Sequence, residues 1–253
     1  MRFIAIIYLT IAGHSAFCQI NVQQEEKRSR AQKEQKHVIK KPKTFLNAIK
    51  IPGALIGMGV YSCLSDGVIS RYEVREERNE HLPNFHTSVD NYLMHAPVAI
   101  VYGLNIAGVK GKHDFKNRTL LLVKSEAIML ALTYSLKGLT NVPRPDGSDV
   151  ESFPSGHTAQ AFATATFMAK EYGDQSIWYA VGAYGIATTV GAMRILNNRH
   201  WVSDVFAGAG IGILSTNLAY LTHRYRWKKK PSQLTIIPSY ASGPSLYLSY
   251  TFK

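Results

Sequence analysis

Six apolar stretches of helix length fall between residues 45 and 221, and they constrain the fold more than any other feature of the chain. They lie near Phe45–Leu64, Tyr92–Val109, Thr119–Leu136, Thr158–Ala169, Ile177–Met193 and Val205–Leu221. No internal repeat or domain boundary interrupts Thr44–Tyr225. We therefore expect one all-α domain, a helical bundle of about six helices.

Small residues and hydropathy bear on whether this bundle lies in a membrane. Glycine and alanine are frequent in Ala180–Gly185 and Ala207–Gly212, and small residues let helices approach closely, as in membrane bundles. A full span needs about 20 apolar residues, but several stretches are shorter or contain Lys124 and Glu126. The mean hydropathy of −0.08 is low for six spans. A membrane-embedded bundle and a membrane-associated one both fit.

Three short polar clusters lie at the ends of the apolar stretches in the second half of the chain. The first has a lysine and an Arg-Pro pair, the second is Pro-Ser-Gly-His, and the third has an arginine, a histidine and an aspartate. Their polar side chains and one glycine are the candidate site residues: Lys137, Arg144, Ser155, Gly156, His157, Arg194, His200 and Asp204.

The spacing within each cluster indicates what it can do. Lys137 ends one apolar stretch and Arg144 lies on the next loop, so both cations can point at one anion. Ser155-Gly156 opens a helix whose free N-terminal amides suit an anion. Asp204 follows His200 by four residues, so a helical start lets the carboxylate orient the imidazole. Each piece alone is ordinary, but their order predicts a site that binds and attacks phosphate.

The chain resembles the type 2 phosphatidic acid phosphatase superfamily, which includes bacterial lipid phosphatases and is related to vanadium haloperoxidases. The family signature is Lys-x6-Arg-Pro, Pro-Ser-Gly-His and Ser-Arg-x5-His-x3-Asp, and the three clusters match it in this order. Met193 departs from it, because the family usually has serine there. The loop from Asp146 to Phe153 is also shorter than is common.

The resemblance implies a metal-independent phosphatase that uses no cofactor and forms a phosphohistidine intermediate. It makes His200 the nucleophile, Asp204 the residue that orients it, and His157 the general acid and then base. The phosphate-binding groups it implies are Lys137, Arg144, Ser155, Gly156 and Arg194.

The implied reaction is hydrolysis of a phosphate monoester or diphosphate, on a lipid such as undecaprenyl diphosphate, a lipid A phosphate or phosphatidylglycerol phosphate. The main alternative is a soluble periplasmic acid phosphatase acting on small phosphate esters. Minor alternatives are a vanadate-dependent haloperoxidase and a catalytically idle envelope protein that binds anionic lipid through basic tails. The sequence does not choose among the three lipids or give the oligomeric state.

The N-terminal segment bears on the location of the protein. Residues 1–18 have Arg2, an apolar core and a plausible cleavage site after Cys18, as a secretory signal peptide does. Cleavage would leave Cys63 as the only cysteine, which excludes an internal disulfide. We expect a bacterial cell-envelope protein, in the inner membrane with its site facing the periplasm or in the periplasm itself.

Basic segments flank the helical domain. We expect a signal peptide at 1–18, a basic polar linker at 19–43, the phosphatase helical domain at 44–227, and a basic tail with a β-hairpin at 228–253. The linker and the tail contribute much of the formal net charge of +12, which suits an anionic lipid surface. We expect no nucleic-acid partner, because no binding module accompanies the charge.

Six membrane spans and a cleaved signal peptide predict opposite sides of the membrane for the segment Gln19–Thr44. With six spans and the clusters outside, Gln19–Thr44 would be inside, as its positive charge favours. A cleaved signal would place the same segment outside. Either the signal is not cleaved in the standard way, or some of the helices do not cross the membrane.

The last residues follow another pattern. Leu234–Tyr240 and Leu246–Phe252 alternate apolar and polar residues around Ser242-Gly243, which predicts a hairpin. We favour a small ribbon packed on the bundle over an outer-membrane targeting strand.

Overall fold

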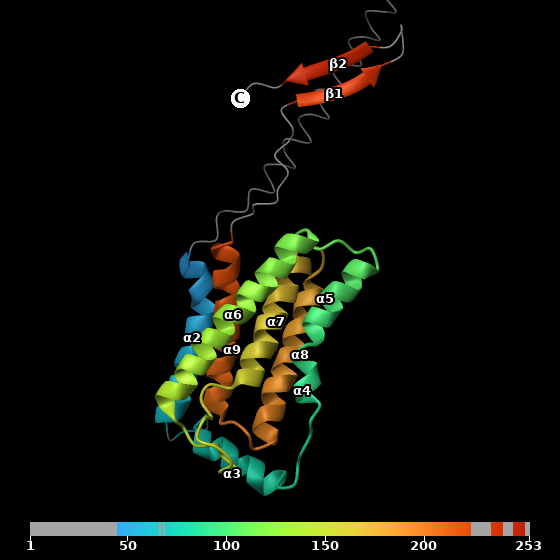
Figure 1. The fold of residues 1–253 in the computed structure, drawn as a ribbon. Helices are drawn as coiled ribbons and strands as arrows, with labels where there is room; N and C mark the ends of the chain where they lie inside the picture. Colours follow the sequence, from blue (N-terminus) through green and yellow to red (C-terminus); the bar gives the residue numbers. More distant parts are fainter. Residues whose placement is uncertain (1–44, 66, 68, 224–233, 240–244, 251–253) are drawn as a thin grey trace, which may run out of the picture. The chain divides into compact units, whose positions relative to one another are not determined.

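The computed structural model describes residues 45–65, 67, 69–223, 234–239 and 245–250 (Figure 1). The expected signal peptide, the basic linker and the basic residues after His223 lie outside the described residues. Eight helices make up the described bundle, which confirms the all-α class. They are α2 (Phe45–Leu64), α3 (Arg71–His81), α4 (Asp90–Leu93), α5 (Ala96–Ile106), α6 (Phe115–Thr140), α7 (Gly156–Tyr172), α8 (Ile177–Leu196) and α9 (Val202–Leu221).

Two of these helices were not expected from the apolar pattern. The stretch from Tyr92 to Val109 divides into α4 and α5, with Pro97 in the first turn of α5, where proline is best tolerated in a helix. Helix α3 is mostly charged and has no fully buried residue. It begins at Ser70, whose side chain accepts a hydrogen bond from the Tyr72 amide and so satisfies a free N-terminal donor.

The starts and ends of the long helices follow local sequence signals. Asp114, Ser155 and Ser176 cap α6, α7 and α8, each accepting a hydrogen bond from a backbone amide of the first turn. Helix α6 stops at Asn141, which has a left-handed conformation with φ of 46°. Asparagine adopts this conformation more readily than most residues, so the chain can turn there toward the loop that carries Arg144.

Helix α9 lies at the centre of the bundle and packs against α2, α6, α7 and α8. Its glycines allow this. A Cβ on Gly208 would lie 2.5 Å from the Ser155 carbonyl oxygen at the start of α7, and one on Gly210 would lie 2.8 Å from the Pro52 carbonyl oxygen of α2. The expected close packing is therefore present along Ala207–Gly212. A Cβ added to Gly182 or Gly185 of α8 would meet no atom within 4 Å, so packing does not require these two glycines.

The order of the helices brings the three clusters together. Helices α6 and α8 end, and α7 and α9 begin, at one end of the bundle, and α3 lies across that end (Figure 1). Backbone contacts join the elements there, since the Ser155 amide donates to the Asp204 carbonyl oxygen at 3.0 Å. This end of the bundle holds the candidate site.

Two strands, β1 (Leu234–Ser239) and β2 (Ser245–Tyr250), pair antiparallel with Leu234 opposite Tyr250. The residues of the expected turn lie outside the described residues. The complete hairpin and its packing on the bundle therefore stay predictions.

Candidate active site

His200 and Asp204 meet as the sequence predicts, but not within one helix. Helix α9 starts at Val202, with Trp201 as its N-cap, so His200 precedes the helix. Asp204 lies in the first turn and reaches back over the cap, placing its Oδ2 3.3 Å from Nδ1 of His200. This contact leaves Nε2 of the imidazole facing away from the carboxylate.

Other donors hold the Asp204 carboxylate in place. The Ser152 hydroxyl donates to Oδ2 at 2.5 Å, and the Trp201 amide donates to the same oxygen at 3.0 Å. Asp204 is fully buried. A buried carboxylate with several donors keeps both its charge and its orientation, so Asp204 is a fixed partner for the imidazole.

Burial governs the protonation of His200, whose side chain is 2% exposed. It lowers the pKa of His200 from 6.5 to about 4, although Asp204 opposes this shift. Water cannot solvate the imidazolium there, and the nearby Arg194 and Arg144 charges also disfavour it. At neutral pH His200 is uncharged and Nε2 retains its lone pair.

The second cluster begins α7. Ser155 is the N-cap and is fully buried, and its hydroxyl lies 2.9 Å from that of Thr158. Its position is therefore explained first by helix capping. Gly156 is not required by protein packing, since the nearest atom to an added Cβ, in Thr133, would be 3.9 Å away.

The cations of the first cluster come from α6 and the loop after it. Lys137 lies in the last turn of α6, and its Nζ donates to the Glu151 carbonyl oxygen. Arg144 donates through Nη1 to the Arg199 carbonyl oxygen at 3.3 Å, and its Nε lies 3.6 Å from an oxygen of Asp149. Both cations therefore contact the short loop from Asp146 to Phe153.

Arg194 is held by a carboxylate from another part of the chain. Its Nη1 donates to Oδ2 of Asp90 at 2.7 Å, in a pair whose side chains are 10% and 1% exposed. The Nε of Arg194 is buried and has no hydrogen-bond partner among the described residues. A buried donor left without a partner costs about 1–3 kcal/mol, so an anion oxygen that accepts from Nε would be favoured.

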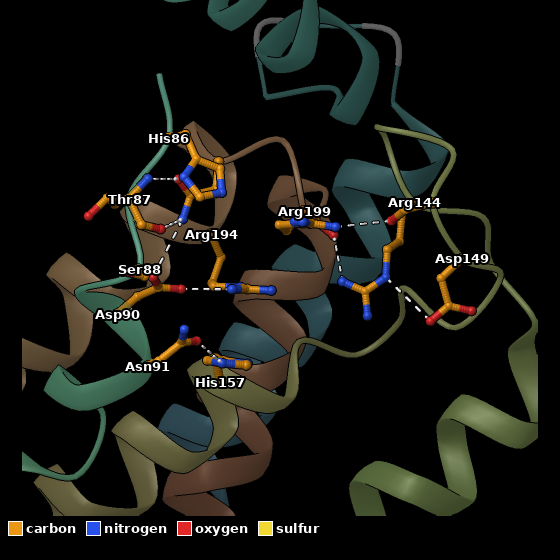
Figure 2. Close-up of a pocket in the computed structure, with 12 residues that line it drawn as sticks. His86, Thr87, Ser88, Asp90, Asn91, Arg144, Asp149, His157, Arg194 and Arg199 are labelled. Atoms are coloured by element: carbon orange, nitrogen blue, oxygen red, sulfur yellow. Dashed lines mark hydrogen bonds and ion pairs between the residues drawn. The ribbon is translucent and has the colours of Figure 1, made fainter. Parts of the chain in front are cut away.

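His157 projects from the first turn of α7 toward Asn91, whose Oδ1 lies 2.8 Å from its Nε2 (Figure 2). Burial lowers the pKa of His157 from 6.5 to about 4, and the nearby Arg194 charge adds to the effect. His157 is therefore neutral at pH 7, as His200 is. A bound phosphate would raise the pKa of His157, because a nearby negative charge favours the imidazolium.

A cavity of about 460 Å³ opens beside these side chains. Figure 2 shows Arg194 and His157 on one side of it and Arg144 on the other. The other predicted residues are not among its lining. The twelve lining residues are His86, Thr87, Ser88, Asp90, Asn91, Arg144, Ser148, Asp149, His157, Arg194, Asn197 and Arg199. Met193, where the family signature has serine, does not line this cavity and is half-buried in α8.

Several residues of the site were missed in the sequence. Ser152 lies just before the second cluster and Arg199 just before His200, so their proximity to the motifs is the only available signal. Asp90 and Asn91 precede the third cluster by more than 100 residues, and no spacing rule relates them to it. Among the described residues, no group of three or more His, Cys, Asp or Glu side chains is arranged to hold a metal ion.

Comparisons with known proteins agree with the resemblance. Residues 118–228 match the family model of the PAP2 superfamily, and this range contains all three clusters. A protein of Porphyromonas gingivalis named Lipid A 1-phosphatase is 40% identical over 154 residues, which are 58% of this chain and 33% of that protein. The chain therefore spans about a third of the length of this relative.

Two solved structures are also similar. The first transmembrane PAP2 type phosphatidylglycerolphosphate phosphatase from Bacillus subtilis is 20% identical, with a TM-score of 0.51, over 69% of this chain and 98% of that one. LpxE from Aquifex aeolicus is 24% identical, with a TM-score of 0.44, over 57% of this chain and 93% of that one. The likeness to the Bacillus subtilis protein supports the helical fold.

Proposed function

We propose that the chain is a phosphatase acting on a phosphate monoester or diphosphate of a lipid. Its residues 118–228 match the family model of the PAP2 superfamily. One observation carries the proposal. A neutral His200 in contact with the Asp204 carboxylate lies at the same end of the bundle as His157, Arg144 and Arg194, which line one cavity.

The first chemical step follows from this arrangement. Nε2 of His200 attacks phosphorus, and an N–P bond forms while the bond from phosphorus to the leaving oxygen breaks. His157, protonated when phosphate is bound, gives its proton to that oxygen. Arg144 and Arg194 bind the equatorial phosphoryl oxygens, and Lys137, the Ser155 hydroxyl and the Gly156 amide complete the phosphate-binding set. Asp204 stabilises the positive charge that develops on His200.

The second step reverses the role of His157. It takes a proton from water, whose oxygen attacks phosphorus, and the N–P bond breaks to release phosphate and neutral His200. Every proton in this cycle moves to or from His157, water or the leaving group. The proposed reaction therefore uses neither a metal ion nor a cofactor.

The substrate belongs to the lipid class. The relative that is 40% identical over 154 residues is named Lipid A 1-phosphatase, so a lipid A phosphate is our first choice among the three candidate lipids. The same name favours a lipid over the small soluble ester, the haloperoxidase reaction and a catalytically idle protein.

Exposed apolar side chains support a membrane location. Two described helices, α6 and α9, are long and apolar enough to cross a membrane, but α9 is mostly buried in the bundle. Helix α6 presents Val123, Leu130 and Tyr134 outward, each at least 45% exposed. Contiguous exposed apolar surface is typical of membrane contact. We propose an envelope location, in the inner membrane, with the site facing the periplasm.

The domain boundaries and the C-terminal ribbon belong to the same proposal. A signal peptide at 1–18 and a basic linker at 19–43 would precede the phosphatase domain at 44–227, and the tail at 228–253 would add the hairpin. Protease accessibility of residues 19–43 in intact cells and in spheroplasts distinguishes a cleaved signal from a retained first span.

A phosphate-release panel tests the function. It compares undecaprenyl diphosphate, a lipid A phosphate, phosphatidylglycerol phosphate and a soluble phosphate ester, with the wild type and His200→Ala. We expect release from a lipid at least about tenfold faster than from the soluble ester, none with His200→Ala, and no effect of EDTA, because no step uses a metal.

Other outcomes would contradict the mechanism or favour one of the alternative functions. Turnover retained in His200→Ala, or strong inhibition by EDTA, would contradict the mechanism. Faster release from the soluble ester would favour the periplasmic acid phosphatase. Bromide oxidation after addition of vanadate would favour the haloperoxidase.

A further inference from the structure

Two neighbouring residues outside the three clusters each contact a residue of a different cluster. Asp90 pairs with Arg194 at 2.7 Å, and Asn91 lies 2.8 Å from Nε2 of His157. Arg194 belongs to the end of α8 and His157 to the start of α7, so the first residues of α4 join two separate helices (Figure 2). Both residues lie outside the segment that matches the superfamily.

We propose that Asp90 and Asn91 are positioning residues of this site. Asp90 orients the guanidinium of Arg194 toward bound phosphate, and Asn91 selects the tautomer of His157 that carries its hydrogen on Nε2. The inference rests on the proposed function for its catalytic meaning, because a fixed tautomer matters only if His157 transfers a proton.

The contact with Asn91 sets the role of each ring nitrogen. The Asn91 amide is oriented with Oδ1 toward Nε2 of His157. An amide oxygen only accepts, so this orientation matches the tautomer in which Nε2 donates. In the neutral ring Nδ1 then holds the lone pair, and it is the atom that gains and loses the catalytic proton. Without Asn91 the ring could rotate and exchange tautomers, and part of the population would present the wrong nitrogen.

The contact with Asp90 sets the orientation of Arg194. Asp90 is fully buried, and it accepts from Nη1 of the guanidinium, while Nε of Arg194 has no partner among the described residues. The planar guanidinium is therefore fixed at one corner, and its remaining donors are available to an anion.

The segment that carries the two residues is itself held against the end of α8. The Asn197 side chain donates to the Thr87 carbonyl oxygen at 2.9 Å and accepts from the Thr87 amide at 2.8 Å. Arg78 of α3 donates to the carbonyl oxygens of Leu196 and Phe85 at 2.8 and 3.2 Å. These contacts hold the segment just before α4 against the end of α8.

A carboxylate in place of Asn91 would change the acidity of His157 in a known direction. The charged and titratable groups around this imidazole are Arg194, Asp90, His200 and Arg144, and His86 also lines the cavity. Asn91→Asp adds a negative charge beside the ring, which raises the pKa of His157. Asn84→Asp is the matched control, because Asn84 is exposed in the connection between α3 and α4 and does not line the cavity.

The first test does not need turnover. In the 253-residue protein with ¹⁵N-labelled histidine in detergent micelles, the His157 signals are identified by their loss in His157→Gln. We expect the Nε2–H tautomer in the wild type, a pKa higher by at least about one unit in Asn91→Asp, and no change in Asn84→Asp. Asn91→Ala should show a mixture of tautomers. An Nδ1–H tautomer in the wild type, or equal pKa values in both Asp variants, would overturn the proposal.

The second test uses the rate at saturating lipid phosphate. The basic limb of the kcat profile reports loss of the His157 proton in the complex, so Asn91→Asp should move it to higher pH and Asn84→Asp should not. Asn91→Ala should lower kcat about tenfold or more with little change in KM. An unchanged limb and an unchanged kcat in the Asn91 variants would reject the positioning role.

Asp90→Asn should raise KM more than it lowers kcat, because it misplaces a phosphate-binding arginine. Removing one partner of a buried ion pair also destabilises the fold, so the decision rests on the two Asn91 variants. If no lipid phosphate is hydrolysed, the proposed function fails, while the histidine titration still decides whether Asn91 fixes His157.

Discussion

Asp204 has two structural roles at the residue scale. Its side chain accepts from the Trp201 amide at the start of α9, and the same oxygen faces the imidazole of His200. Its backbone carbonyl accepts from Ser155, which caps α7. The orientation of His200 is thus coupled to the starts of both helices, so the position of the imidazole depends on how the helices begin.

We expect replacement of the Asp204 carboxylate to change the pH dependence of kcat/KM. Asp204 raises the pKa of His200 against the larger effect of burial, which brings it to about 4. Protonated His200 has no lone pair, so kcat/KM should fall as the pH drops through about 4. Asp204→Asn removes the opposing charge, and we expect this acid limb to move to lower pH. The rate at neutral pH should fall roughly 10²- to 10⁴-fold, because the imidazole loses its orienting partner. An acid limb that moves upward would contradict this assignment.

The contacts within the protein do not explain why position 156 is a glycine. An added Cβ would meet nothing closer than 3.9 Å, so packing alone tolerates a side chain there. The proposed phosphate near the free amides at the start of α7 would give a reason for a glycine at this position.

At the scale of elements, the packing of α9 against α7 fixes the distance between the second and third clusters. Gly208 faces the Ser155 carbonyl oxygen, and Gly212 faces the backbone of Ala159 and Ala163. Close approach of these two helices is what brings the α7 start within hydrogen-bond distance of Asp204. A bulkier α9 would separate the two clusters.

A pair of glycine substitutions tests this packing. In Gly208→Ala the added methyl would lie 2.5 Å from the Ser155 carbonyl oxygen, and the strain should destabilise the protein by about 1–3 kcal/mol and lower its activity. In Gly182→Ala of α8 nothing lies within 4 Å of the methyl, and the change should be neutral or stabilise by up to ~1 kcal/mol. Thermal unfolding in detergent micelles measures both. Equal Tm values for the two variants would show that α7 and α9 are not closely packed.

At the scale of the whole molecule, the bundle presents polar groups at one end and apolar side chains along its length. The candidate cavity is lined by His157 at the start of α7 and Arg194 at the end of α8. Figure 1 shows α3 across this end of the bundle, while the outer face of α6 is apolar. A phosphate headgroup at a membrane surface would reach the cavity while its acyl chains stay in lipid. This arrangement fits the proposed action on a lipid phosphate.

Cysteine labelling tests both the membrane location and its orientation. With Cys18 and Cys63 replaced by Ser, Val123→Cys places a thiol on the exposed face of α6, and Asn84→Cys places one at the site end. A membrane-impermeant maleimide should label only Asn84→Cys in intact spheroplasts, and both variants after denaturation in SDS. Labelling of Val123→Cys before solubilisation would contradict membrane embedding, and failure of Asn84→Cys to react would contradict the periplasmic orientation.

The sequence by itself determined the helical class, and it predicted the chemistry of the site. Apolar stretches of helix length require partners to bury them, and Lys137, Arg144, His157, Arg194, His200 and Asp204 have spacings that keep them at helix ends. Such signals are local in the chain. The same local reasoning missed α3, because its charged residues have no apolar pattern. It also predicted close helix packing at Gly182 and Gly185, where an added Cβ would meet no atom within 4 Å.

Only the tertiary structure decided which distant residues support the site. Asp90 reaches Arg194 across 104 positions in the chain, and Ser152 reaches Asp204 across 52. Contacts of this kind depend on how close α7, α8 and α9 pack and on the path of the connection from α3 to α4. Packing distance is a property of facing surfaces, so no spacing within one segment of sequence could have given it.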